Sequence, residues 1–390
     1  MAAIIFFVAI ALILFLDREK IKLEKILFPF FYLVLYRTKL GLKLMDQKAR
    51  KYNELLKLLG YCFIGIAFIG MIFMTITIFA NIIGLIFNPA TTQSGVALVL
   101  PFTNIPGIGY LPFIEWLLAI FILAIVHEFS HGVMARAHDV PVKSSGFAFF
   151  SIIIPIIPAA FVEPDEKVLK KKSDIVQYSV FAAGPASNLI LALLIFLFSS
   201  FVMAPIEARI TEPVGFSFEL TNSTLPAAQA GLEKGMIITS FDNETITDGN
   251  SFSEYMYYCS KPNESVYLGT ENKTYEIQSA DVEGRNIIGV SNIQNEVRIK
   301  EKFRFWEGTF FWIKSFLKWL GLFNLFIGLA NLLPLGIVDG GRILQVALNK
   351  ITTKKKAMKI FLIVTWLLLF SLLFALIVQY FGNPFSFLFR

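Results

Sequence analysis

The chain has 390 residues, of which 56% are hydrophobic and only 16% are charged, with a formal net charge of +6. Soluble domains carry about a quarter charged residues, so this composition places most of the chain in a lipid bilayer. No basic patch is interleaved with aromatic residues, which sets nucleic acid aside as a partner. The two cysteines lie far apart and support neither a disulfide framework nor a cysteine-type zinc cluster.

Long apolar runs predict about six membrane-spanning helices, because roughly 20 apolar residues cross a bilayer. The first run, 2–16, lacks the basic start and the small-residue cleavage site of a signal peptide, which favours a short membrane helix. The run 26–36 is short and contains Pro29, which favours an interfacial or re-entrant piece. The remaining spans are predicted at 59–88, 113–136, 175–203, about 310–334 and 358–381.

The distribution of lysine and arginine orients these spans. Eleven of these residues lie between 17 and 58, none lies between 90 and 112, and further groups follow the span 113–136 and precede the last span. Cytoplasmic loops are enriched in basic residues, so these three basic segments are predicted to be cytoplasmic. Both termini are then extracytoplasmic in a multi-pass protein of the cell membrane.

All three histidines lie in the stretch AIVHEFSHGVMARAHDV, residues 124–140. His127 and His131 are four residues apart, so a helix projects both from one face, and Glu128 lies between them. This is the HExxH pattern of zinc hydrolases, in which the histidines bind Zn²⁺ and the glutamate is the general base. Ionisable residues inside a membrane segment are costly and indicate a function, although a solvated cluster at the helix end is the alternative.

A catalytic zinc ion needs a third protein ligand. His138 does not fit, because the three-histidine pattern requires a glycine three residues after His131 and its last histidine three residues further on, where this chain has Met134 and Ala137. A surface role is expected for His138. A carboxylate remains, and Asp339 lies in NLFIGLANLLPLGIVDGGRIL, where proline and glycine interrupt the helix. Non-helical backbone at membrane depth is tolerated only around a buried site or cavity, so Asp339 is predicted as the third ligand.

The segment 142–164, VKSSGFAFFSIIIPIIPAAFVEP, is apolar but contains two prolines and many β-branched and aromatic residues, which disfavours a continuous helix. It is predicted to form a membrane-associated hairpin or a re-entrant loop. Its edge could pair with an extended substrate, or it could be a packed loop without substrate contact.

Residues 205–300 differ from the rest of the chain. They contain short alternating runs and turn sequences such as FDNET, and fourteen acidic against seven basic residues from 206 to 300 give a net charge of −7. A separate extracytoplasmic domain is predicted. Four Asn-x-Ser/Thr sequences are either glycosylation acceptors or a consequence of turn composition, and they begin at Asn222, Asn243, Asn263 and Asn272.

Three motifs in order resemble those of the site-2 protease family of intramembrane zinc metalloproteases: HEFSHG at 127–132, GPASN at 184–188 and NLLPLGIVDGG at 331–341. Residues 225–243 look like the front half of the PDZ domain that many members insert between their second and third core spans. The resemblance covers about 113–348. The chain departs from the family at Gly336 and Val338, where proline and leucine are common.

The resemblance implies cleavage of substrate helices within the bilayer by a zinc enzyme whose site faces the cytoplasm, with the ligands and the base predicted above. It also favours contact of Asn188 and Asn331 with an unwound substrate backbone or with the oxyanion. Hydrogen bonding between helices is the alternative for these two residues, because an unpaired amide is costly in lipid.

The predicted fold class is a polytopic α-helical membrane protein with an inserted extracytoplasmic α/β PDZ-like domain. Its parts are an N-terminal membrane region with a basic loop, a membrane core split by the inserted domain, and a C-terminal helix. Their boundaries are 1–110, 111–204, 205–300, 301–348 and 349–390.

The leading hypothesis is a protease of regulated intramembrane proteolysis that cuts single-span membrane proteins. A protease that clears signal peptides from the membrane would share the site and differ in its substrate. A zinc transporter would need metal-binding residues along a path, whereas this chain has one cluster. The domain at 206–300 is expected to exclude substrates with bulky external parts; recruitment of a newly cut C-terminus is the alternative.

Overall fold

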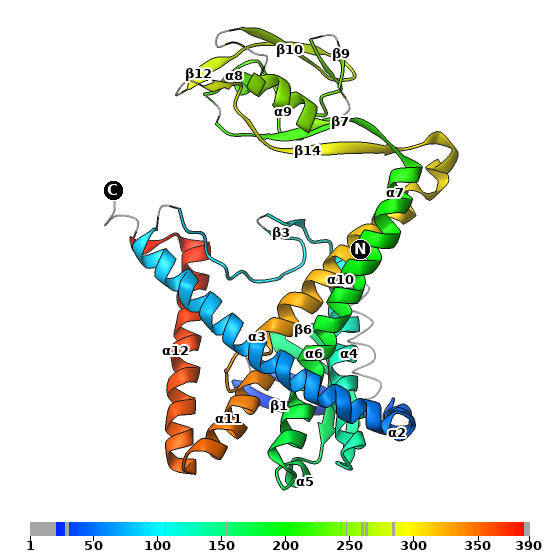
Figure 1. Cartoon of the computed structure of the whole chain (residues 1–390), viewed down its shortest axis with the longest axis vertical. Coiled ribbons are helices and arrows are strands. Elements are labelled where there is room, and N and C mark those ends of the chain that lie inside the picture. Colours follow the sequence, from blue (N-terminus) through cyan, green and yellow to red (C-terminus); the bar gives the residue numbers. More distant parts are fainter. Residues whose placement is uncertain are drawn as a thin grey trace. The chain divides into compact units, whose positions relative to one another are not determined.

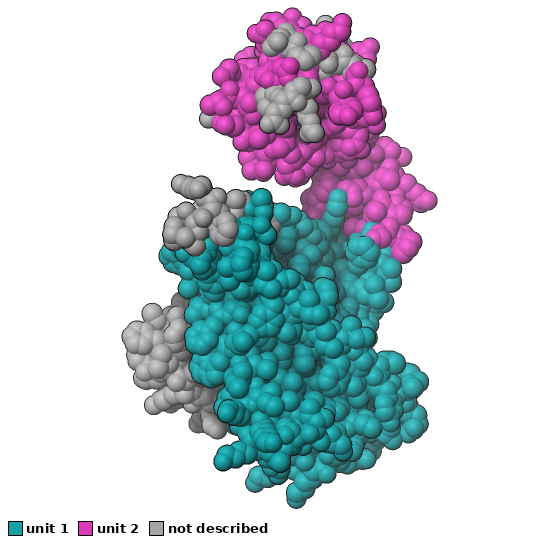
Figure 2. All heavy atoms as spheres, turned by 60° about the vertical axis from the view of Figure 1, so that its left-hand side comes forward, with its two compact units in different colours: residues 1–199, 313–390 teal, residues 200–312 magenta. Residues whose placement is uncertain are grey.

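A computed structural model describes residues 21–27, 31–89, 91–105, 107–152, 154–222, 224–242, 244–246, 248–258, 261, 264–282 and 285–385 (Figure 1). The short span predicted at 2–16 lies outside these residues. The chain divides into two compact units, which are coloured separately in Figure 2. Unit 1 comprises 1–199 and 313–390, and unit 2 comprises 200–312, which includes the predicted domain.

Five helices in the described part of the chain are long and apolar enough to cross a membrane. They match the five long spans predicted from the sequence, and they are Asn53–Phe87, Phe113–Ala137, Asp174–Ile210, Glu301–Ala330 and Lys354–Phe381. The fourth ends at Ala330 and not near 334, which corrects the predicted boundary. Pro334 has no N–H to donate to the Ala330 carbonyl, and its ring would clash with the preceding turn.

The membrane region is built from helices of very different lengths. They are α2 (Leu42–Lys51), α3 (Asn53–Phe87), α4 (Phe113–Ala137), α5 (Glu166–Leu169), α6 (Asp174–Phe198), α10 (Glu307–Ala330), α11 (Asp339–Ile351) and α12 (Lys354–Phe381). The loop between α3 and α4 contains the short strands β3 (Asn104–Ile105) and β4 (Gly109–Tyr110).

An antiparallel sheet in unit 1 has the strand order β1-β2-β5-β6. Its strands are β1 (Ile21–Leu27), β2 (Phe31–Thr38), β5 (Val142–Ile152) and β6 (Ile154–Pro164). The segment 142–164 therefore forms a hairpin, as predicted. The described residues of 26–36 belong to β1 and β2 and join the same sheet, a strand pairing that the sequence did not predict.

The helices that carry the sequence motifs share one core. It contains buried residues of α3, α4, α6 and α11, among them Phe63, Met134, Ala183 and Ile343. The face of α6 that packs in this core carries small residues. Four of them are buried there: Ala182, Ala183, Gly184 and Ala186. Small residues let helix backbones approach closely in a membrane, so α6 and α4 can place polar side chains in direct contact.

Unit 2 is a mixed α/β domain. The π-helical turn η2 (Ser199–Met203) and α7 (Ala204–Ile210) lead into β7 (Thr211–Leu220), which pairs antiparallel with β14 (Val290–Ile299). A second sheet has the order β11-β10-β8-β9. Its strands are β8 (Ser240–Phe241), β9 (Glu244–Thr245), β10 (Ser265–Gly269) and β11 (Thr274–Gln278).

The remaining elements of unit 2 are α8 (Pro226–Gln229), α9 (Gly249–Tyr258), the pair β12 (Ala280–Val282) and β13 (Arg285–Ile287), and the 3-10 helix η3 (Glu301–Trp306). The domain has its own core, centred on Phe216, Phe252, Leu268 and Ile277. Asn222 and Asn272 are exposed, whereas Asn243 and Asn263 lie outside the described residues.

Candidate metal centre

Helix α4 places the two imidazoles of the HEFSH motif side by side. His127 and His131 lie one turn apart, and their Nε2 atoms are 3.1 Å from each other. Each histidine is only 8% exposed. The sequence spacing of four residues therefore produces two nitrogen donors on one buried face, as an α-helix requires.

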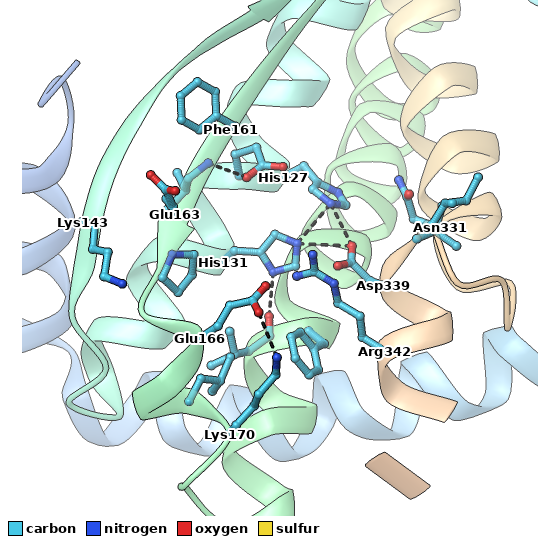
Figure 3. A pocket seen from close by; sticks show the side chains of 18 of the residues that line it. His127, His131, Lys143, Phe161, Glu163, Glu166, Lys170, Asn331, Asp339 and Arg342 are labelled. Carbon is cyan, nitrogen blue, oxygen red and sulfur yellow. Dashed lines mark hydrogen bonds and ion pairs between the residues drawn. The ribbon is translucent and has the colours of Figure 1, made fainter. Parts of the chain in front are cut away.

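Asp339, the first residue of α11, brings its side chain to the same point. Its Oδ2 atom lies 3.1 Å from Nε2 of His127 and 3.3 Å from Nε2 of His131. Figure 3 shows the three side chains converging at one end of a cavity. Asp339 is 212 residues from His127 along the chain, so the contact depends entirely on tertiary structure.

The break between α10 and α11 positions Asp339. After Ala330 the chain turns, and the N–H of Gly340 donates to the Asn331 carbonyl at 2.8 Å. A Cβ atom at Gly340 would overlap the carbonyls of Leu332 and Leu333, and one at Gly341 would overlap the Leu335 carbonyl. The two glycines after Asp339 therefore allow the first turn of α11 to pack directly on the backbone of the break.

The three donors suit a tetrahedral zinc ion. Nε2 of His127, Nε2 of His131 and a carboxylate oxygen of Asp339 all lie within 4.8 Å of one another. Tetrahedral ligands at roughly 2.0–2.1 Å from zinc lie about 3.3 Å apart, close to the separations of 3.1 to 3.3 Å found here. Nitrogen and carboxylate donors are also the types that zinc prefers.

Gly184 of the GPASN motif leaves the space between these donors free. A Cβ atom at this position would lie 2.6 Å from Nε2 of His127 and closer still to Nε2 of His131. Helix α6 therefore packs closely against α4 directly at the candidate metal centre.

Glu128 lies beside the group but does not belong to it. It lines the cavity together with His127 and His131. The backbone N–H of Val162 in β6 donates to its Oε2 atom at 2.8 Å. A strand of the sheet thus fixes the orientation of the carboxylate that was predicted to be the base.

The cavity has a volume of about 710 Å³ and is bounded by α4, β6, α6 and the segment from Asn331 to Arg342. Asn331 is among its lining residues. Asn188 is not, and it is fully buried with 0% exposure. The two asparagines that the sequence singled out therefore have different surroundings.

Charged residues from the β5–β6 hairpin and α5 line the rest of the cavity. Lys143 pairs with Asp165 at 3.1 Å, and Lys170 pairs with Glu166 at 3.0 Å. Hydrogen bonding to Lys143 lowers the pKa of Asp165, and that to Lys170 lowers the pKa of Glu166, so both carboxylates are charged at neutral pH. The cavity that contains the buried donors therefore also has charged side chains on its wall.

His138 lies at the end of α4, outside the group of three donors. It follows His131 by seven residues, which is about 10 Å along a helix axis. Burial, together with Lys57 and Lys172, lowers the pKa of His138 and keeps its ring neutral at pH 7. The structure gives no reason to count it among the ligands.

The variant Asp339→Ala is expected to lose more zinc affinity than the roughly 10- to 100-fold that follows loss of a group that only orients a ligand, because two histidines alone complete too little of the coordination sphere. His138→Ala is the matched control and is expected to keep the zinc content of the natural protein. Metal analysis of both purified variants measures the effect. Undiminished zinc in Asp339→Ala would place the third ligand elsewhere, and loss of zinc in His138→Ala would restore that histidine as a candidate.

Fold and site together define a polytopic helical membrane protein with a buried His/His/Asp group on the wall of a cavity. The sequence profile of Peptidase family M50 matches residues 115–375. The chain therefore belongs to this family, the site-2 protease family, and its membership supports an intramembrane metalloprotease. Zinc dependence is general in the family.

Two individual proteins are similar to this chain. An uncharacterized protein of Methanocaldococcus jannaschii is 28% identical over 366 residues, covering 87% of this chain and 89% of that protein. The PDZ domain of the SdrC-like protein of Listeria monocytogenes is 24% identical, covers 20% of this chain and 86% of that structure, and has a TM-score of 0.18.

Two of the contacts at the centre that were not predicted from the sequence involve the main chain. Both are made by backbone groups: the N–H of Val162 to Glu128, and the carbonyl of Val180 at 2.7 Å from Nδ1 of His131. A backbone group leaves no trace in residue type, so no pattern in the sequence could indicate them.

Proposed function

We propose that this protein is a zinc-dependent intramembrane endopeptidase that cleaves transmembrane segments of single-span membrane proteins in regulated intramembrane proteolysis. The observation that carries the proposal is the convergence of His127, His131 and Asp339 beside Glu128 on the wall of one cavity. The histidines and Glu128 lie on a helix long and apolar enough to cross a membrane, which supports the proposal that cleavage takes place within the bilayer.

Zinc held by the three donors would lower the pKa of a water molecule to about 7 and polarise the scissile carbonyl. Glu128 lines the same cavity without joining the ligand group, so its carboxylate can accept the proton of the attacking water. It can then deliver that proton to the leaving amine. The hydrogen bond from Val162 restricts the movement of the Glu128 carboxylate on the cavity wall.

The substrate would bind as an extended segment along β6. This strand is at the edge of the sheet in the described part of the chain, and its residues Phe161, Val162 and Glu163 line the cavity. A helix must unwind before its peptide bonds can be attacked, and a strand edge offers hydrogen-bond partners to the backbone groups that become free. The N–H of Val162 is excluded from this pairing, because it donates to Glu128. We assign Asn331 to the same substrate segment, since its side chain also lines the cavity.

The orientation in the membrane follows from the distribution of basic residues. The segments 17–58, 167–172 and 350–359 carry the clusters of lysine and arginine. We therefore assign them, and the opening of the cavity, to the cytoplasmic side, with both termini and unit 2 outside. In this orientation the protein is a multi-pass protein of the cell membrane and acts on substrates embedded in the lipid bilayer.

The direct test uses the purified full-length chain in detergent with a panel of single-span membrane proteins. Cleavage within the apolar segment is expected, together with its loss after treatment with a zinc chelator and its recovery on addition of Zn²⁺. Mass spectrometry of the products locates the cut bond. Cleavage that persists after metal analysis has shown complete removal of zinc would contradict the proposal.

We assign a PDZ-like fold and the role of a size filter to unit 2, on the resemblance of residues 225–243 to a PDZ domain. Its pairing geometry makes a clean deletion possible. Thr211 and Ile299 are partners in the β7–β14 ladder, and Lys300 donates its N–H to the Ile210 carbonyl at 2.8 Å. The two points at which the chain enters and leaves the domain therefore lie side by side.

Replacing residues 212–298 by a short Gly/Ser linker is expected to leave zinc bound and to permit cleavage of clients that keep a large external domain. Cleavage of clients with short external parts should change little. Rates for matched long and short clients, measured with the natural and shortened chains, distinguish the roles. If the folded, zinc-loaded deletion variant lost activity on short clients, the domain would instead recruit substrate.

A further inference from the structure

Two asparagines lie near the candidate metal centre, but only one of them faces the cavity. Asn331 lines it, whereas Asn188 is fully buried and is absent from its wall. A residue that contacts neither the cavity nor solvent cannot reach a substrate backbone in this arrangement. We infer that Asn188 is a positioning residue, which holds the ring of His127 in the form that can bind metal.

The contact that supports this inference is short and direct. The side-chain amide of Asn188 on α6 lies 3.1 Å from Nδ1 of His127 on α4. The other ring nitrogen, Nε2, faces Asp339 at 3.1 Å and His131 at 3.1 Å. Nδ1 is therefore the ring atom left for an orienting hydrogen bond, and Asn188 makes that bond.

The chemistry of a neutral imidazole decides which way the bond runs. Nε2 can bind a metal only when the proton is on Nδ1, and Nδ1–H then needs an acceptor. His131 has one, because the carbonyl of Val180 lies 2.7 Å from its Nδ1. For His127 the acceptor must be Oδ1 of Asn188.

The amide of Asn188 can present either end to the ring. With Nδ2 next to the ring, Oδ1 is buried without a hydrogen-bond partner. That arrangement would also make Nδ1 the acceptor and leave the proton on Nε2, where it blocks metal binding. Turning the amide over places Oδ1 on Nδ1–H and frees the lone pair of Nε2. The two ends of an amide are nearly equal in size, so the hydrogen bonds decide its orientation.

Packing keeps Asn188 at this distance. Helix α10 approaches α6 so closely that a Cβ atom at Gly328 would lie 3.2 Å from Cβ of Asn188. The side chain is thus confined between α10 and the ring of His127, and it is fully buried. A fixed acceptor of this kind sets both the tautomer and the orientation of the ring before any metal arrives.

The inference rests on the proposed function only in that the three donors bind zinc, so its test measures metal affinity and not cleavage alone. Asn188→Leu removes the acceptor at similar volume, and zinc affinity is expected to fall about 10- to 100-fold. Asn188→Asp restores an acceptor and is expected to bind zinc within a few-fold of the natural protein, because carboxylates serve histidine ligands equally well. Competition with a chromophoric chelator measures the zinc affinity of the natural protein and of both variants.

A control separates this role from the general cost of losing a buried amide. Asn324 is another fully buried asparagine on an apolar helix, and its Nδ2 donates to the Leu320 carbonyl at 2.8 Å. Asn324→Leu is expected to lower thermal stability without weakening zinc. The visible spectrum of the Co²⁺-substituted protein should change in Asn188→Leu and stay unchanged in Asn324→Leu. If Asn188→Leu does not fold, Asn188→Ala replaces it in the comparison with Asn188→Asp.

The possible outcomes distinguish failure of the proposed function from failure of the inference about Asn188. A natural protein that binds no zinc at these residues overturns the proposed function and this inference together. A natural protein that binds zinc, with Asn188→Leu of equal affinity and unchanged Co²⁺ spectrum, overturns this inference alone. If Asn188→Leu had an altered KM and unchanged metal affinity, Asn188 would be assigned to substrate binding instead. If Asn188→Asp lost as much zinc affinity as Asn188→Leu, the role of Asn188 as a hydrogen-bond acceptor would also be rejected.

Discussion

Glu128→Gln is expected to retain zinc and to lower the rate of cleavage by a factor on the order of 10²–10⁴, the usual contribution of a general base. Glutamine has nearly the size of glutamate, and its side-chain oxygen can still accept the hydrogen bond that Val162 donates at 2.8 Å. It cannot take a proton from water. Because Glu128 is outside the group of three donors, the metal should remain.

Glu163→Gln is the matched control for this experiment. Glu163 is a second carboxylate on the cavity wall, where Arg37 lies 3.2 Å away and Ser144 donates a hydrogen bond at 2.6 Å. Its neutralisation should change the rate by only a few-fold. Cleavage rates and zinc content are measured on the same preparations. Turnover by Glu128→Gln at a tenth or more of the natural rate would remove Glu128 from the role of base.

Gly184→Ala is expected to abolish both zinc binding and cleavage. The new methyl group would lie 2.6 Å from Nε2 of His127 and closer to Nε2 of His131, so it would occupy the space between the donors. Relief by movement of α6 is restricted, because Ala182, Ala183 and Ala186 are buried on this helix around the glycine. Zinc analysis, thermal stability in detergent and cleavage rate give the three readings.

Gly65→Ala tests whether any glycine-to-alanine change in a membrane helix has this effect. Gly65 lies in α3, and a Cβ atom there would meet nothing within 4 Å. This variant should behave as the natural protein. A Gly184→Ala protein with full zinc content would show that the free space between the histidines is not where the metal binds.

The sequence predicted the elements that depend on local composition. The five long spans could be recognised because apolar length alone identifies them, and a spacing of four residues was enough to place His127 and His131 on one face. The end of the span near Ala330 was misplaced, since a hydropathy pattern continues through Pro334 whereas the helix cannot. The proximity of Asp339 to the histidines could be proposed only from the proline and glycine residues that interrupt the apolar segment around it and from the resemblance to the site-2 protease family.

What could not be predicted depends on contacts between distant segments. β2 pairs with β5 from Phe31↔Ile152 to Thr38↔Ser145, and nothing within either segment specifies that partner. The same holds for Asn188 and His127, which are 61 residues apart. The sequence correctly marked Asn188 as unusual on an apolar helix, but only the packing of α6 distinguishes it from Asn331.

The separation of Asp339 from the two histidines has a consequence for biosynthesis. The third donor follows His127 by 212 residues, so a nascent chain carries both histidines long before it contains the carboxylate. At roughly 5–20 residues per second, translation of the intervening segment takes on the order of tens of seconds. During that time the chain lacks the third donor of the proposed zinc site, so under the proposed function it would not yet cleave protein. Formation of the break after α10 would then act as a delay, with activity beginning only after Asp339 has been made.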